Sequence, residues 1–188
     1  SIVEVINNCT RLRKFAITGI NRSNKWSGGK CNDISSLRIN RKADLNLKCV
    51  VVPFSADQED YSLVCELLQR TSSLQIEHVT LVGSQDLSDN ILYHLCKFQN
   101  LKELDFANAV GLSDSSLIAI ASVCKNILSL NVSHCTTLTD VSGVFIIQVL
   151  VNLTILNISH CRFTDVTFNA IHQRSCHSHL SVCSKTLP

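Results

Sequence analysis

The chain has 188 residues, of which 45% are hydrophobic, 17% are charged and two are proline. This composition is too apolar and too weakly charged for a disordered chain. The net charge of +2 does not by itself point to nucleic acid as a partner. The longest apolar run, residues 144–151 interrupted by Gln148, is much shorter than the roughly 20 residues of a membrane span, so we expect no membrane partner.

The sequence repeats a unit that has apolar residues at its positions one, four and six, and each unit is expected to begin with a strand. Two degenerate units begin at Leu12 and Ile34, and residues 47–73 follow as a convex insert with a helix over Tyr61–Arg70. Four regular units come next, and then an incomplete seventh strand at Leu180. The regular units begin at Ile76, Leu101, Ile127 and Leu153.

One domain is therefore expected over residues 1–188. Its repeats are degenerate over residues 1–73, regular over 74–175 and incomplete over 176–188. A single unit cannot bury its apolar face alone, whereas stacked units share one core, so at least ~3 units are needed for a stable fold.

The regular units share more than their apolar spacing. Cys135 and Cys161 are 26 residues apart, and the tripeptide Ser-His-Cys ends at each of them. Alternating apolar residues predict a short strand with one buried face. The Thr-Asp pairs that follow, such as Thr139 and Asp140, predict helix starts, because their side chains can accept hydrogen bonds from free backbone N–H groups.

The repeated order Leu-x-x-Leu-x-Leu-x-x-Cys-x-x-Leu-Thr-Asp resembles the leucine-rich repeat, and its cysteine-containing subclass in particular, over residues 9–182. The resemblance implies an α/β solenoid, a horseshoe arc of about six repeats with parallel strands on the concave face and helices and loops on the convex face. The subclass is familiar from F-box proteins, so the resemblance also implies substrate recognition in an SCF-type E3 ubiquitin ligase with a Skp/cullin core. No segment of the sequence resembles an F-box.

Ten cysteines raise the question of disulfides. Most of them recur at equivalent points of the repeats, which predicts small, buried and reduced side chains in a cytoplasmic or nuclear protein. The alternative is a secreted chain with disulfides and with glycans at the Asn-x-Ser/Thr sequons, although two of these sequons lie within predicted strands. The sequons begin at Asn8, Asn21, Asn131, Asn152 and Asn157.

Two groups of residues contain side chains of the kinds that catalyse reactions or bind metals. His134 and His160 each precede a cysteine, but neighbouring residues on a strand point to opposite sides, so no nucleophile and base pair is expected. Four residues near the end of the chain could bind zinc on one helical face, yet Leu180 and Val182 favour a strand there. Those four are His172, Cys176, His179 and Cys183. We expect no enzyme activity, no cofactor and no metal.

Residues between the buried strand positions should project onto the concave face, which solenoids commonly use for binding. We expect a protein partner there, in contact with polar and diverse side chains. Charge is also segregated, with a net +7 over residues 1–50 and −5 over 51–188, but few aromatic residues accompany the basic part, so nucleic acid is not expected. The candidate contact residues are Arg38, His78, Glu103, Asp105, Ser129, Asn131, His134, Ile155, Asn157 and His160.

Together these observations predict a non-catalytic protein–protein interaction module. Substrate recognition for a ubiquitin ligase is the form that the resemblance adds. The alternatives are a structural or assembly scaffold subunit, in which the same arc joins stable partners, and an extracellular recognition domain, which would require occupied sequons.

Overall fold

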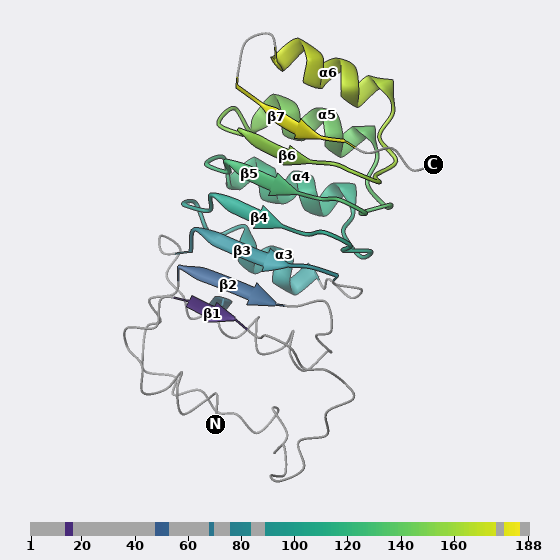
Figure 1. The fold of residues 1–188 in the computed structure, drawn as a ribbon. Coiled ribbons are helices and arrows are strands. Elements are labelled where there is room, and N and C mark those ends of the chain that lie inside the picture. Colours follow the sequence, from purple (N-terminus) through teal and green to yellow (C-terminus); the bar gives the residue numbers. More distant parts are fainter. Residues whose placement is uncertain are drawn as a thin grey trace, which may run out of the picture.

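The computed structural model describes residues 14–16, 48–52, 68–69, 76–83, 89–175 and 179–184, and the statements below concern these ranges. Seven strands form one parallel sheet in which the spatial order is the chain order (Figure 1). The strands are β1 (Lys14–Ala16), β2 (Cys49–Val52), β3 (His78–Leu81), β4 (Glu103–Asp105), β5 (Ser129–Asn131), β6 (Ile155–Asn157) and β7 (Ser181–Cys183).

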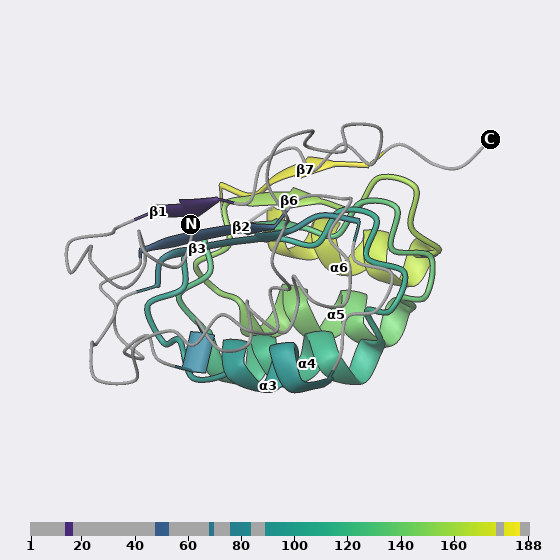
Figure 2. The same cartoon turned by 90° about the horizontal axis from the view of Figure 1, so that it is seen from below.

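Four helices connect the later strands and cover one face of the sheet. Figure 2 shows the two layers, with the strands in one and the helices in the other. The helices are α3 (Asp89–Leu95), α4 (Asp114–Val123), α5 (Asp140–Val149) and α6 (Asp165–Ser175). The other sheet face carries no helix in the described part of the chain, and we call it the open face; it corresponds to the expected concave face.

The helix starts follow the expected chemistry. The Ser113 hydroxyl accepts a hydrogen bond from the backbone N–H of Ser116 at 3.2 Å, and the Thr139 hydroxyl accepts one from Val141 at 3.3 Å. Both residues have extended backbones, as N-caps do. The Ser/Thr-Asp pairs therefore start the helices, as the sequence predicted.

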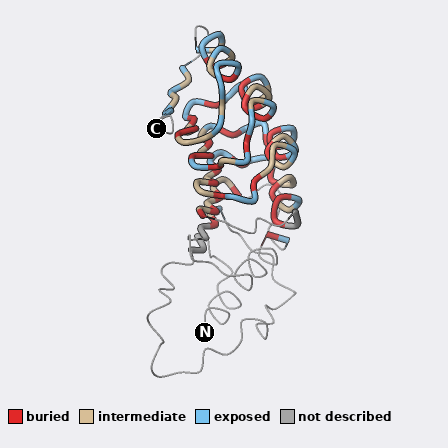
Figure 3. Tube along the Cα trace, turned by 90° about the vertical axis from the view of Figure 1, so that its right-hand side faces the viewer, coloured by how far each residue is buried: buried red, intermediate tan, exposed pale blue. Residues whose placement is uncertain are grey.

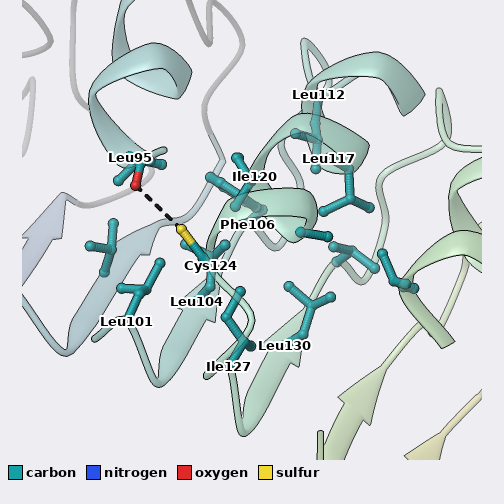
Figure 4. Packing of buried hydrophobic residues seen from close by; sticks show 14 of the residues in the cluster. Leu95, Leu101, Leu104, Phe106, Leu112, Leu117, Ile120, Cys124, Ile127 and Leu130 are labelled. Carbon is teal, nitrogen blue, oxygen red and sulfur yellow. Dashed lines mark hydrogen bonds between the residues drawn. The ribbon is translucent and has the colours of Figure 1, made fainter. Parts of the chain in front are cut away.

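The core lies between the two layers, where Figure 3 shows the buried residues of strands and helices facing each other. The central residue of each strand contributes one column that is at most 2% exposed from β2 to β6. Its members are Val50, Val79, Leu104, Leu130 and Leu156. In the interior shown in Figure 4, the Cys124 thiol lies among leucine and isoleucine side chains and donates to the Leu95 carbonyl at 3.5 Å.

Strand β2 corrects the sequence-based expectation. The second strand was expected in the unit that begins at Ile34, and residues 47–73 were expected to form a convex insert. Instead Cys49–Val52 pairs with both β1 and β3, so these four residues belong to the sheet. The reason is that a run of valines has a high strand propensity but lacks the alternation by which the other strands were placed.

Residues 17–47 lie outside the described ranges, and so does most of the helix expected over Tyr61–Arg70. Of that helix, residues 68–69 are described and helical, and Leu68 is fully buried. Strand β7, in contrast, confirms the strand expected at Val182. The division of the chain into degenerate, regular and incomplete parts stays a prediction.

Candidate functional site: the open face of the sheet

The strand register brings most of the predicted contact residues together on the open face. His78, Glu103, Ser129 and Ile155 are paired in sequence across β3 to β6 and form the first column. The second column lies two residues further along each strand. It consists of Thr80, Asp105, Asn131 and Asn157.

Arg38, which was also predicted in the second column, lies outside the described residues. The register position between β1 and β3 in that column belongs to Val51.

In the first column, three polar side chains are followed by one apolar side chain. The Nδ1 atom of His78 lies 2.8 Å from Oε2 of Glu103, and the side chains are 38% and 60% exposed. Ile155 is 54% exposed, which is unusual for a large apolar residue in a strand whose central Leu156 is fully buried. The first column thus offers one acidic side chain and one apolar side chain two strands apart.

The second column has a structural role that the sequence analysis did not assign. Asp105 accepts a hydrogen bond at Oδ1 from the backbone N–H of Ala107 at 2.9 Å. Asn131 and Asn157 each accept one at 3.1 Å, from Ser133 and Ser159. Each bond turns the chain off its strand and fixes the side chain. The second carboxylate oxygen of Asp105 and the amide NH2 groups of the asparagines are thereby held at defined positions on the open face.

His134 and His160 lie in the turns that follow β5 and β6 rather than in the strands. Both follow the ends of their strands and have left-handed backbones, with φ of 61° and 59°, as does Asn108 in the preceding repeat with 59°. Their rings are stacked with centroids 4.3 Å apart. The extended geometry expected for the two histidines is therefore wrong, because the chain has already turned off the strand at these positions.

The neighbouring cysteines are interior groups. The Cys135 thiol donates to the Phe106 carbonyl at 3.1 Å, and the Cys161 thiol donates to the Val132 carbonyl at 3.0 Å. Burial raises the pKa of the Cys135 thiol to about 12 and that of the Cys161 thiol to about 11. A thiol with such a pKa is protonated at neutral pH and is a poor nucleophile.

The other described cysteines are also free thiols, namely Cys49, Cys96, Cys124 and Cys183. Among the ranges given above, no group of three or more possible ligands lies close enough to hold a metal ion. The candidate zinc residues do not share one helix, because His172 is in α6 and Cys183 is in β7, while Cys176 is outside the described residues. No helix in this part of the chain is long and apolar enough to cross a membrane.

A charged row that the sequence analysis missed borders the open face. The residues just before β2, β3 and β4 are Lys48, Glu77 and Lys102, and both ammonium groups reach the one carboxylate, at 2.9 and 2.8 Å. Hydrogen bonds from Lys102 and then Lys48 lower the pKa of Glu77 to about 2. The order Lys-Glu-Lys is visible in the sequence at the positions just before β2, β3 and β4, but only when the place of β2 is known.

Comparison with known protein families and with curated proteins finds no match. The solved structures that match this chain include two bacterial proteins. One is an internalin, InlF, of Listeria monocytogenes, with 16% identity and a TM-score of 0.55 over 97% of this chain and 50% of that one. The other is a protein of Bacteroides fragilis, with 16% identity and a TM-score of 0.47 over 74% of this chain and 41% of that one.

The chain thus spans about half the length of these two proteins or less. The likeness to the Listeria protein covers almost the whole chain and agrees with the parallel sheet and its layer of helices. The leucine-rich-repeat solenoid implied by the sequence resemblance is confirmed.

Proposed function

We propose that this leucine-rich-repeat chain is a non-catalytic protein–protein interaction module that holds a protein partner on the open face of its sheet. The observation that carries the proposal is the alignment of the two columns, whose side chains are varied and mostly polar, with Ile155 54% exposed among them. Hydrogen bonds to the backbone fix Asp105, Asn131 and Asn157. When a partner covers an apolar side chain that is exposed to water, the free energy of the complex is lowered, so such a side chain favours binding.

Photo-crosslinking tests the proposal. A photoreactive amino acid is placed at Ser129 on the open face, and in a matched variant at Gln148, which is exposed on α5. We expect the Ser129 variant to crosslink to a defined protein in cells, the purified pair to form the same crosslink, and the Gln148 variant to give none. Equal crosslinking from both positions, or from neither, would contradict binding at this face.

The finer form of the proposal follows the cysteine-containing subclass. In that form the chain recognises substrates for an SCF-type ubiquitin ligase in the cytoplasm or nucleus, and a Skp/cullin core is reached through sequence outside residues 1–188. Partners captured at Ser129 should then accumulate when the proteasome is inhibited, and the full-length protein should copurify with a Skp/cullin core. A full-length sequence that contains no F-box would exclude this form.

The alternative is a structural or assembly scaffold subunit. A permanent complex of fixed stoichiometry, with a partner level that proteasome inhibition leaves unchanged, would favour it. An extracellular recognition domain is the least supported form. Among the described sequons, the Asn131 and Asn157 side chains already bond to backbone N–H groups, whereas Asn152 is exposed in a turn. A glycosidase-sensitive mass shift at Asn152 would favour the extracellular form.

A further inference from the structure

We infer that the partner contributes an extended segment in which a lysine or arginine is followed, three residues later, by a large apolar residue, and that this segment crosses β4, β5 and β6 on the open face. This inference rests on the proposed function and specifies the chemistry of the partner. Three features of the face carry it: the sign of its charge, the place of its exposed apolar side chain, and the free hydrogen-bonding groups between the two.

The charge of the open face is acidic. Glu103 and Asp105 alternate on β4 and so project from the same face, about 7 Å apart at ~3.3 Å per residue. From β3 to β7, neither column contains a lysine or an arginine. The side chains beside the two acids in the register are neutral hydroxyl and amide groups and the histidine ring. They belong to His78, Thr80, Ser129 and Asn131. A cationic side chain is therefore the complementary group at β4.

The apolar contact lies two strands away. Ile155 on β6 is 54% exposed, and its register neighbours Ser129 and Ser181 are small. The apolar contact on the open face is therefore the Ile155 side chain itself. Burial of this side chain favours binding in proportion to its area.

The distance between the acidic side chains on β4 and Ile155 on β6 determines how many residues separate the basic and the apolar residue of the partner segment. Neighbouring strands are ~4.8 Å apart, so β4 and β6 are separated by about 10 Å. An extended chain in the polyproline II conformation rises ~3.1 Å per residue with three residues per turn, so residues three apart lie about 9 Å apart and on the same side of the chain. Residues three apart in an extended segment of this kind can therefore occupy the acidic and apolar positions together.

Asn131 favours an extended segment over a helix. It lies on β5, between the two contacts, with its Oδ1 already bonded to the backbone N–H of Ser133 at 3.1 Å. Its NH2 group is a donor that can meet a backbone carbonyl of the segment. An extended segment has free carbonyls, whereas those of a helix interior are bonded within the helix.

The test uses the purified chain and fluorescent nine-residue peptides with one arginine, one leucine and otherwise glycine and serine, with the leucine one to seven positions after the arginine. Fluorescence anisotropy should show the tightest binding at a separation of three, with affinity falling as salt is raised. Glu103→Gln and Asp105→Asn should each weaken this peptide about threefold, and the double variant by about tenfold, as expected for exposed ion pairs.

The variants are matched to the fold. Asparagine stands naturally at the equivalent positions 131 and 157, so Asp105→Asn keeps the acceptor that fixes the turn. Asp165→Asn removes the same charge from the start of α6 and should leave the affinity unchanged. Ile155→Ser should abolish the preference for the leucine-containing peptide over one with serine in its place.

Affinity that is independent of spacing, a preference for seven residues as a helix would give, insensitivity to the Glu103 and Asp105 variants, or no binding at millimolar peptide would each overturn the inference. The proposed function is tested separately by crosslinking from Ser129. A partner captured there whose binding ignores both acidic residues would leave the interaction module standing and remove only this description of its partner.

Discussion

Asp140 is the first residue of α5, and its carboxylate binds the start of the next repeat. It accepts hydrogen bonds from the backbone N–H of Thr164 at 2.9 Å and from the hydroxyls of Thr164 and Thr167, both at 2.5 Å. Asp114 makes the same three contacts to Thr139 and Ser142. Burial acts to raise the pKa of both carboxyls, but these hydrogen bonds outweigh it and the pKa is lowered. The ionised carboxylate is thus part of the contact between repeats.

We expect Asp140→Asn to lower the free energy of unfolding by about 1–2 kcal/mol, because an amide offers one acceptor oxygen where the carboxylate offers two. Urea unfolding followed by circular dichroism measures this change. Asp165→Asn at the same helix position in α6 is the control, with an expected change below ~0.5 kcal/mol. An equal loss in both variants would show that the helix start, rather than the contact between repeats, depends on the carboxylate.

Thiol labelling distinguishes interior from surface cysteines. Burial raises the pKa of Cys124 and Cys135 to about 12, and both side chains are fully buried, whereas Cys183 is exposed. In the folded protein at pH 8, we expect iodoacetamide to modify Cys183 and to leave Cys124 and Cys135 unmodified, since the thiolate is the reactive form. Peptide mass spectrometry identifies which cysteines are modified. Denatured protein, in which all three should react, is the control; rapid labelling of Cys135 in the native state would contradict this burial.

At the scale of the elements, α5 and α6 lie close together at Gly143. A Cβ atom on this glycine would lie 2.5 Å from Oγ1 and 2.9 Å from Cγ2 of Thr167. The same hydroxyl is the donor to Asp140, so its position is already fixed. At the other end of the pair, the guanidinium of Arg174 donates to the carbonyls of Ile147, Val151 and Leu153 at 2.8–3.1 Å. The two helices are therefore joined at both ends, with little space between them at Gly143.

We expect Gly143→Ala to destabilise the protein by about 1 kcal/mol, although alanine is the better helix former, because the added methyl group displaces Thr167 from its hydrogen bond. In a Thr167→Ala background the two shortest contacts are gone and the contact with Cδ1 of Phe163, 3.0 Å from the added Cβ, remains, so the same substitution should cost clearly less. A double-mutant cycle measured by urea unfolding reports this coupling. The same cost in both backgrounds would contradict a steric origin.

The regular repeats were predictable because each local signal is repeated there. The strands around Leu104, Leu130 and Leu156 and the helix starts at Ser113 and Thr139 follow from alternation and capping residues. Strand β2 was not predictable from the sequence. The segments between β1, β2 and β3 are longer than those between the later strands, and its run of valines has no alternation. Spacing alone therefore could not place the second strand.

The candidate site was predictable in part for a similar reason. The columns from β3 to β6 follow from strand alternation, and the residues paired there are those predicted. The bond from Asn131 to Ser133 and the left-handed backbone of His134 depend on where the strand ends. A strand of three residues can end one residue earlier or later without any change in its apolar pattern.

For the molecule as a whole, three acidic groups make stability depend on pH in the same direction. The pKa of Glu77 is about 2 in the folded protein, against an ordinary 4.5, chiefly because of the hydrogen bond from Lys102. The pKa values of Asp114 and Asp140 are also lowered. A group whose pKa is lower in the folded state stabilises the fold above its unfolded pKa, and this stabilisation is lost as the pH falls through the folded value.

The free energy of unfolding should therefore decrease slightly below about pH 6.5, because burial lowers the pKa of His94 and the unfolded chain binds that proton first, and should decrease further between about pH 4.5 and 2, where the carboxyls are protonated. Urea titrations at a series of pH values measure it. In Glu77→Gln the decrease should be shallower, and added salt should reduce the difference between the two proteins, because the ion pairs at Glu77 are near the surface. A wild-type curve that stays flat down to pH 3 would contradict the contribution of these carboxylates.

The bond from the aspartate of one repeat to the Thr or Ser pair of the next gives the array a direction and a rule for growth. A unit such as residues 128–153 carries both halves of this contact, since it contains the donors Thr139 and Ser142 and the acceptor Asp140. An in-frame tandem duplication of this unit would insert a repeat that fits its neighbours on both sides. Gene duplication could thus lengthen the solenoid without the evolution of a new interface, whereas a unit lacking either half could only end it.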